Sequence, residues 1–243
     1  MADRVTWITG GTKGLGFALA KRLARRKHNV VVSARSIDDT DLDGLKGHAL
    51  DITNHDQVGE VIDRIERNEG PIHQAVLNAG THQPVDATEF TVEGLRKLVD
   101  INLFGTASCI EHLIPRMKAR GRGRIAIVAS VAGYIGLPTA AYYGTSKAAL
   151  INLAETLRVE LEAHKIVVQL GNPGVIKTPL TDKNDFAMPF LMPADKAAEA
   201  MAAGLDSDRF EITFPKVFTY QMKLLRLMPY FGSLFLTKRA RRR

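Results

Sequence analysis

The chain has 243 residues, 45% of them apolar, and a formal net charge of +7 at pH 7. This length and apolar content are ordinary for a soluble globular protein with a large core, and the lack of linkers and repeats favours one domain over two. The sequence contains no run of 18 apolar residues without charge and no recognisable signal peptide, which argues against a membrane-spanning helix and predicts a cytoplasmic protein.

The positive charge is concentrated in one part of the sequence. Residues 216–243 contain eight Lys and Arg residues and no acidic residue, whereas the rest of the chain carries 25 Lys and Arg against 26 Asp and Glu. This distribution argues against nucleic-acid binding by the part of the chain before residue 216. The one cysteine, Cys109, cannot form an internal disulfide, which favours a reducing compartment, and its apolar surroundings predict a buried structural thiol.

Short apolar runs alternate with amphipathic stretches along the chain. The runs predict strands at Arg4–Thr9, Asn29–Ser33, His48–Leu50, Gln74–Leu77, Arg124–Ala129, Ile166–Gly171 and Phe210–Phe214. The stretches between them predict helices at Gly14–Arg26, Asp56–Asn68, Val92–Lys118, Ala141–His164 and Ala194–Leu205. This alternation indicates an α/β fold, a Rossmann-type doubly wound parallel sheet of about seven strands with helices on both faces. We expect one domain over residues 1–215 and a C-terminal extension over residues 216–243 that is not a separate domain.

The first predicted strand ends in a glycine-rich loop, Thr9-Gly10-Gly-Thr-Lys13-Gly14-Leu-Gly16, which opens the first helix. Glycines permit a tight turn and a close approach of the backbone to a pyrophosphate, and the helix N-terminus offers amide donors. We therefore predict a dinucleotide-binding loop, with a purely structural turn as the alternative. The predicted contacts are Gly10, Thr12, Lys13, Gly14, Leu15 and Gly16.

The end of the second strand predicts which dinucleotide binds. An NAD site of this kind generally has an acidic residue here for the ribose 2′-hydroxyl. This sequence has Ala34 followed by Arg35, and Lys13 points from the loop toward the same region. Two cations without a carboxylate suit a 2′-phosphate and predict NADP(H); the alternative is that both are ordinary solvated charges.

Further cofactor contacts are expected at the ends of the next two strands. Asp51 ends the third apolar run, with Ile52 beside it, and could bond the adenine amino group. Asn78, Ala79 and Gly80 follow the fourth strand, where small side chains let a cofactor lie against the backbone.

The motif Tyr143-Gly-Thr-Ser-Lys147 carries the strongest chemical information. Residues four apart on a helix lie on one face, which places Lys147 beside Tyr143. An ammonium beside a phenol favours the phenolate, so Tyr143 could exchange protons near neutral pH, as a carbonyl–alcohol interconversion requires. Tyr142 has Ser146 four residues later and is expected to be a packing residue.

These motifs resemble those of the short-chain dehydrogenase/reductase family, in its TGxxxGxG and YxxxK subtype, from residue 4 to about residue 214. The match covers the glycine loop, Asn78-Ala-Gly80, Asn102, Ser130, Tyr143 with Lys147, and Pro173-Gly174-Val-Ile-Lys-Thr178. Leu77 departs from the pattern, because a second asparagine is common there. The resemblance implies an NADP(H)-dependent oxidoreductase that interconverts a carbonyl and an alcohol, with reduction as the favoured direction.

The resemblance also implies a role for each matching residue. Tyr143 would be the general acid in reduction and the general base in oxidation, and Lys147 would lower its pKa and bond the nicotinamide ribose. Ser130 would hold the substrate oxygen, and Asn102 would hold a water that connects Lys147 to solvent. The segment that closes over the nicotinamide would contain Pro173, Gly174, Val175, Ile176 and Thr178.

The substrate side is less specific. The segment after Gly174 carries the apolar residues Leu180, Phe186, Met188, Phe190, Leu191 and Met192. They would either roof a pocket for an apolar small-molecule carbonyl or alcohol substrate or simply pack a flexible lid. His82 could face that substrate or be a plain surface residue, and the other histidines show no metal-like clustering.

Residues 216–243 combine basic residues with an apolar helical stripe formed by Leu224, Leu225, Leu227 and Met228. The stripe could cap the subunit or a dimer seam, make a peripheral membrane contact, or meet an acidic partner. The resemblance implies a homodimer through the helices Val92–Lys118 and Ala141–His164, with a tetramer as the alternative. A rival hypothesis is a non-catalytic NADP(H)-binding sensor or scaffold, but a pure binder does not need the complete set of Asn102, Ser130, Tyr143 and Lys147.

Overall fold

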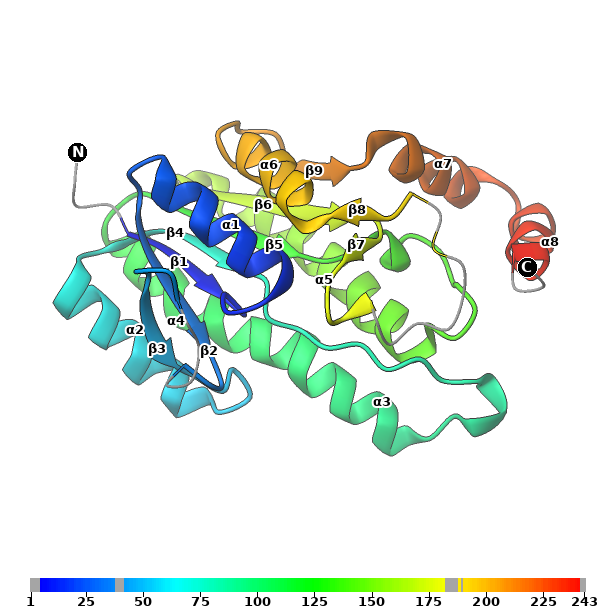
Figure 1. Ribbon diagram of the computed structural model, residues 1–243, viewed down its shortest axis with the longest axis horizontal. Coiled ribbons are helices and arrows are strands. Elements are labelled where there is room, and N and C mark those ends of the chain that lie inside the picture. The colour runs from blue at the N-terminus through cyan, green and yellow to red at the C-terminus, as the bar shows by residue number, and fades with distance from the viewer. Residues whose placement is uncertain (1–4, 38–41, 182–187, 189, 241–243) are drawn as a thin grey trace.

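The computed structural model describes residues 5–37, 42–181, 188 and 190–240 of the chain. At its centre lies a seven-stranded sheet in the order β3-β2-β1-β4-β5-β6-β9, in which every neighbouring pair is parallel (Figure 1). The strands are β1 (Val5–Thr9), β2 (Asn29–Ala34), β3 (Lys46–Ala49), β4 (Ile72–Leu77), β5 (Gly123–Val128), β6 (Ile166–Pro173) and β9 (Glu211–Phe214). The predicted Rossmann-type α/β fold is therefore confirmed.

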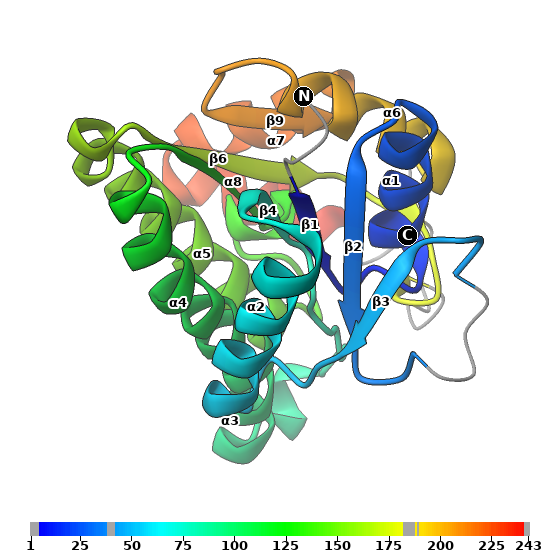
Figure 2. The ribbon, with the colours of Figure 1, turned by 90° about the vertical axis from the view of Figure 1, so that its left-hand side faces the viewer.

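Helices cover both faces of the sheet (Figure 2). One face carries α1 (Gly14–Arg25) and α6 (Ala194–Leu205), and the other carries α2 (His55–Glu69), α4 (Gly105–Ala119) and α5 (Ala141–Glu160). Each face has its own apolar cluster of buried side chains. The central strands are buried from both sides, with Trp7 and Ile8 of β1 both fully inaccessible, which explains their continuous apolar sequences.

The predicted helix Val92–Lys118 is interrupted in the structure. It consists of α3 (Val92–Val99) and α4, joined by a π-helical turn at Asp100–Phe104. Apolar periodicity does not reveal such a turn, because a π-turn adds a single residue within an otherwise continuous helix. The helix predicted over Ala141–His164 likewise ends earlier, since α5 stops at Glu160 and a 3₁₀ turn follows at Glu162–His164.

Two features add to the seven predicted strands and the helices between them. A short parallel pair, β7 (Ile176–Lys177) and β8 (Met192–Pro193), brackets the segment after Gly174. After β9 the chain continues as α7 (Lys216–Leu227) and α8 (Tyr230–Ala240) at one end of the molecule (Figure 1). Among the described helices, none has the length and apolar content needed to cross a membrane. The division of the chain at residue 215 stays a prediction.

Candidate active site

A cleft of about 890 Å³ lies along the carboxyl ends of the central strands, where ligands bind in open parallel sheets. Most of the site residues expected from the sequence line it: Gly10, Thr12, Lys13, Gly14, Leu15, Arg35, Asp51, Ile52, Asn78, Ala79, Gly80, Ser130, Tyr143, Lys147, Pro173, Gly174, Ile176 and Thr178. Three others do not line it, namely Gly16, Asn102 and Val175.

The glycine loop forms a backbone cradle at one end of the cleft. Gly10 and Gly14 have φ values of +65° and +54°, which non-glycine residues rarely adopt. A Cβ on Gly16 would lie 2.3 Å from the carbonyl oxygen of Gly10, so only glycine fits there. The Asn78 side-chain amide donates to the carbonyl oxygens of Thr9 and Gly10, both at 3.2 Å, and holds the loop against β4.

Thr9 is a supporting residue that motif matching did not assign a role. Its Oγ1 accepts hydrogen bonds from the backbone N–H groups of Asn78 and Ala79, each at 3.1 Å. The ends of β1 and β4 are thereby locked together beneath the cleft. A hydroxyl-bearing residue that ends a strand just before a glycine loop is the sequence signal that could have identified it.

Lys13 and Arg35 both line the same part of the cleft and are both exposed. Among the described residues, neither forms an ion pair with a carboxylate, and Ala34 offers no acidic group beside them. The pKa of Asp51 is lowered, first by a hydrogen bond from the backbone N–H of Thr53, and in smaller part by the charge of Arg35. Within the described residues, this region therefore presents two exposed cations to the cleft.

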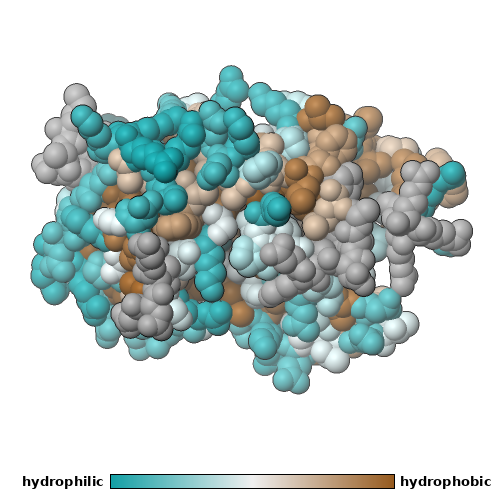
Figure 3. Space-filling model, in the orientation of Figure 1, coloured by the Kyte–Doolittle hydropathy of each residue, from teal (hydrophilic) through white to brown (hydrophobic). Residues whose placement is uncertain are grey.

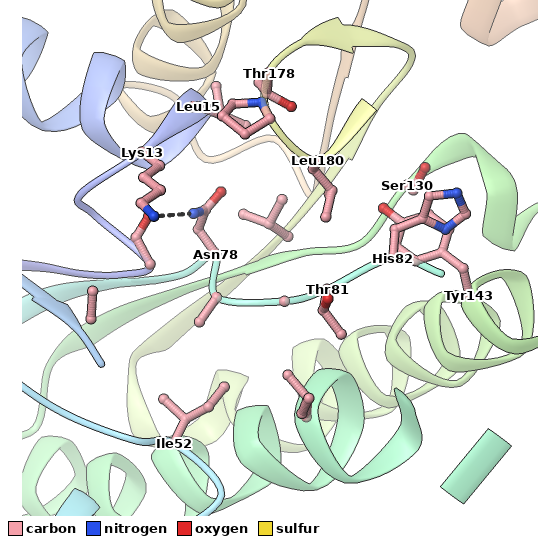
Figure 4. A pocket seen from close by; sticks show the side chains of 18 of the residues that line it. Lys13, Leu15, Ile52, Asn78, Thr81, His82, Ser130, Tyr143, Thr178 and Leu180 are labelled. Atoms are coloured by element: carbon pink, nitrogen blue, oxygen red, sulfur yellow. Dashed lines mark hydrogen bonds between the residues drawn. The ribbon is translucent and has the colours of Figure 1, made fainter. Parts of the chain in front are cut away.

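The opposite end of the cleft brings Ser130, Tyr143 and His82 together (Figure 4). Ser130 lies two residues after the end of β5, and its Oγ accepts the backbone N–H of Ala132 at 3.2 Å, which fixes the start of a 3₁₀ turn. Removal from water raises the pKa of Tyr143 to about 12, and a hydrogen bond with Ser130 acts in the opposite direction. The phenol is therefore protonated at neutral pH.

Lys147 lies behind Tyr143 on the same face of α5. It is 3% exposed, its Nζ donates to the Val128 carbonyl oxygen at 2.9 Å, and Nζ is 5.5 Å from the centre of the Tyr143 ring. Burial lowers the pKa of Lys147 to about 8. The expectation that Lys147 lowers the pKa of Tyr143 is not met by these protein groups, because removal from water outweighs any effect of the ammonium.

Asn102 sits in the π-helical turn and is fully buried. Its Oδ1 accepts the N–H of Thr81 at 2.7 Å, and its Nδ2 donates to the Thr81 carbonyl at 3.0 Å and to Ser146 Oγ at 2.9 Å. The side chain thus clamps the loop after β4 to α5, which positions Thr81 and His82 along the cleft. The water-holding role implied for Asn102 stays a prediction.

The structure shows what Tyr142 and His82, two further residues at the catalytic end, contact. Tyr142 is 1% exposed and its hydroxyl accepts the N–H of Thr91 at 2.7 Å, which confirms it as a packing residue. His82 is 9% exposed and meets the Tyr143 ring edge-on, with ring centres 4.8 Å apart, so it is not a plain surface residue. Whether its imidazole contacts substrate stays a prediction.

Comparison with known proteins agrees with this site. The family model of short chain dehydrogenases matches residues 4–187. The chain belongs to the short-chain dehydrogenase/reductase family. It is 33% identical over 240 residues to an uncharacterised oxidoreductase of Myxococcus xanthus, with 94% of each chain covered.

Solved structures of other short-chain dehydrogenases share the fold. A short-chain dehydrogenase from Streptomyces avermitilis superposes with a TM-score of 0.82 at 23% identity, covering 99% of this chain and 98% of that one. A short-chain dehydrogenase from Burkholderia cenocepacia, solved in complex with NADP, has a TM-score of 0.77 at 27% identity and covers 88% of this chain and 89% of its own. The chain is therefore an oxidoreductase of the class that acts on alcohol and carbonyl groups with a nicotinamide cofactor.

The described residues of the segment after Gly174 divide between the cleft of this short-chain dehydrogenase and helix α7. Leu180 lines the cleft, whereas Phe190 stacks on Phe218 of α7 with ring centres 5.5 Å apart. Phe186, which was expected in the same apolar roof, lies outside the described residues. Among the described residues of this set, Leu180 is the one that lines the cleft.

A partly buried polar cluster centred on Glu211 supports the catalytic end and was not foreseen from the sequence. The Glu211 carboxylate accepts hydrogen bonds from the Tyr134 hydroxyl, from Asn172 Nδ2 at 2.8 Å and from Lys223 Nζ. These donors come from the segment after Ser130, from β6 just before Pro173, and from α7. Burial alone would raise the pKa of Glu211, but the three hydrogen bonds and the Lys223 charge lower it.

We expect the variant Glu211→Gln to destabilise the protein at pH 7 by about 1–3 kcal/mol, because charge-assisted hydrogen bonds are lost in a partly buried site. The pKa of Glu211 is lower in the folded state, so its stabilising effect is present above the ordinary glutamate pKa and is lost as the pH falls through the folded value. The difference between wild type and variant, measured by urea unfolding, should therefore shrink below about pH 5. A stability difference between wild type and Glu211→Gln that is constant with pH would contradict an ionised Glu211. The control variant Lys223→Met leaves two of the three donors to Glu211 and should destabilise the protein less than Glu211→Gln does.

Proposed function

We propose that this chain is an NADP(H)-dependent carbonyl reductase that transfers hydride between the cofactor and an apolar carbonyl compound. The observation that carries the proposal is one continuous cleft with two different ends. A glycine cradle with Lys13 and Arg35 forms one end, and Ser130 with Tyr143 forms the other (Figure 4). A dinucleotide bound along this cleft would bring its reactive ring beside the tyrosine.

Tyr143 would act as the general acid in reduction and as the general base in alcohol oxidation. Its raised pKa, about 12, keeps the phenol protonated at neutral pH, which is the form that gives a proton to the substrate oxygen in reduction. The Ser130 hydroxyl, in hydrogen-bond contact with Tyr143, would bind the same oxygen and stabilise the negative charge that develops on it.

Lys147 and Asn102 would support this proton transfer from behind. The Lys147 ammonium, buried and held by the Val128 carbonyl, supplies positive charge beside the phenol and is placed to bond the nicotinamide ribose. The Asn102 amide holds the Thr81 backbone, and a water near it would connect Lys147 to solvent. Reprotonation of Tyr143 after each turnover would use this route.

The residues present fit a phosphorylated dinucleotide. The positive φ angles of Gly10 and Gly14 suit the close approach of a pyrophosphate, and the missing Cβ of Gly16 lets the Gly10 carbonyl pack against the start of α1. Lys13 and Arg35 suit the 2′-phosphate, Asp51 and Ile52 the adenine, and Asn78 to Gly80 the backbone contact. The bound nicotinamide would supply the hydride, and the protein supplies position and electrostatics.

We also propose that the enzyme is cytoplasmic and forms a homodimer through α4 and α5, which lie on the outer surface of one face of the sheet (Figure 2). Pairing of these helices would bury their outer surfaces in a four-helix seam. A monomeric molar mass in solution would rule this assembly out.

The proposed function predicts a specific response to cofactors. NADPH and NADP⁺ at about one hundred times their dissociation constants should raise the unfolding temperature by roughly 5–10 °C, and NADH and NAD⁺ should do so much less. The protein should then consume NADPH when apolar aldehydes and ketones are added, as followed by NADPH absorbance. Stabilisation by NADH alone would overturn the 2′-phosphate assignment, and a folded protein that responds to none of the four would favour the sensor or scaffold hypothesis.

A further inference from the structure

Helix α7 is firmly attached to the body of the protein through one face. Met222 is 5% exposed within the larger apolar cluster, Phe218 lies over Gly174, and Lys223 pairs with Glu211. The helix therefore has a fixed orientation relative to the cleft. Its opposite face must then point away from the protein.

That opposite face of α7 is apolar. Val217, Tyr220, Leu224 and Leu227 follow each other at intervals of three or four residues and are 61%, 57%, 64% and 82% exposed. This spacing places them in one stripe along the helix. An exposed stripe of large apolar side chains is uncommon on a protein that contacts only water.

On helix α8, polar side chains are buried and apolar side chains are exposed, the reverse of the usual arrangement. The small polar residues Ser233 and Thr237 are buried, and their hydroxyls are satisfied by the carbonyl oxygens of Tyr230 and Leu234. The large apolar residues of the helix are exposed instead: Tyr230, Phe231, Leu234, Phe235 and Leu236. Apolar side chains of α7 and α8 thus gather at one end of the molecule, where Figure 3 shows a concentration of hydrophobic residues.

The charge of residues 216–243 indicates which kind of partner α7 and α8 bind. Residues 216–243 have eight basic and no acidic side chains, and Lys216, Arg226, Lys238 and Arg239 are exposed beside the apolar stripe. A symmetric contact between two copies would bring these like charges together, because a two-fold interface uses the same patch twice. A partner surface that has both apolar groups and negative charges can bind the exposed aromatic side chains and the basic residues together.

We propose that α7 and α8 bind peripherally to a bilayer that contains anionic phospholipid. The aromatic and leucine side chains enter the region between headgroups and acyl chains, and the basic residues contact the lipid phosphates. Neither helix needs to span the bilayer. This binding is independent of the reaction carried out in the cleft.

The test is co-sedimentation of the full chain with vesicles of phosphatidylcholine alone or mixed with phosphatidylglycerol. We expect binding to the mixed vesicles that weakens as salt is raised, and much weaker binding to phosphatidylcholine alone. The triple variant Leu227→Ser/Phe231→Ser/Phe235→Ser should reduce the partition coefficient by about tenfold or more, since each buried apolar side chain contributes strongly. The charge variant Lys238→Glu/Arg239→Glu should also reduce it by about tenfold or more, because each cation near the surface contributes about fivefold.

A matched control removes an exposed apolar side chain elsewhere. Val92→Ser changes a residue that is 67% exposed on α3, outside the proposed α4–α5 seam, and it should bind vesicles like the wild type. All changes are at exposed positions, so each variant should keep the wild-type unfolding temperature. Equal vesicle binding by the triple variant and the wild type would overturn the proposal.

Two further results would point to a different partner and also overturn it. If the wild type ignores both kinds of vesicle and the triple variant halves its molar mass, the patch joins two copies of the chain. If the wild type binds a soluble polyanion such as heparin but neither kind of vesicle, the basic residues serve an acidic partner and the exposed apolar residues do not contact lipid.

Discussion

Replacing Tyr143 with phenylalanine should lower kcat for NADPH-dependent carbonyl reduction by about 10²- to 10⁴-fold, the usual contribution of a positioned proton donor. The aromatic ring and its edge-on contact with His82 are retained, and only the hydroxyl near Ser130 is lost. The dissociation constant for NADPH should therefore be unchanged. Steady-state kinetics combined with a fluorescence titration of NADPH measures both quantities.

Tyr142→Phe is the matched control for this prediction, because the same chemical change is made one residue away. The Tyr142 hydroxyl is buried and accepts the N–H of Thr91, so its loss should cost about 1 kcal/mol of stability without a large change in kcat. Near-normal kcat in Tyr143→Phe, together with an inactive Tyr142→Phe, would reverse the assignment of the general acid.

The sequence was sufficient for the sheet and for many of the residues that line the cleft, for a physical reason. Parallel strands buried on both faces must be continuous apolar runs, as Val30, Val31 and Val32 of β2 are, and the residues after their ends necessarily meet at one edge. Tyr143 and Lys147 are likewise related by local helical geometry alone. Local spacing therefore brings many of the expected residues to one cleft, and the roles assigned to them stay predictions.

The features that sequence analysis missed depend on contacts between distant residues. Glu211 joins Tyr134, Asn172 and Lys223, which are 77, 39 and 12 residues away, and no local pattern connects them. The same holds for the Asn102 clamp on Thr81, because the π-turn that buries Asn102 has no distinct periodicity.

The pKa of Tyr143 was also predicted in the wrong direction. Spacing shows that an ammonium lies near the phenol, but it does not show how completely the site excludes water. The pKa is set by both, and here the loss of water has the larger effect. The pKa of an active-site residue therefore has to be judged from its surroundings in the folded protein.

Replacing Arg35 with alanine should weaken NADPH binding by about 10- to 100-fold and leave NADH binding unchanged, because a hydrogen bond to a charged group contributes about 1.5–3 kcal/mol. Arg35 follows β2 at the edge of the cleft and is exposed beside Ala34, so its removal takes away charge without disturbing the core. The double variant Ala34→Asp/Arg35→Ala should go further. A carboxylate at position 34 can accept the ribose 2′-hydroxyl of NADH and would repel the 2′-phosphate of NADPH.

Titration of each variant with NADPH and NADH gives the ratio of dissociation constants, which separates specificity from a general loss of binding. Arg25→Ala is the matched control, because it removes another exposed arginine from the far end of α1, outside the cleft. If both arginine variants change the ratio equally, the effect comes from net charge and not from position. If Arg35→Ala weakens both cofactors alike, Arg35 contacts a part that they share, such as the pyrophosphate, and the 2′-phosphate assignment rests on Lys13 alone.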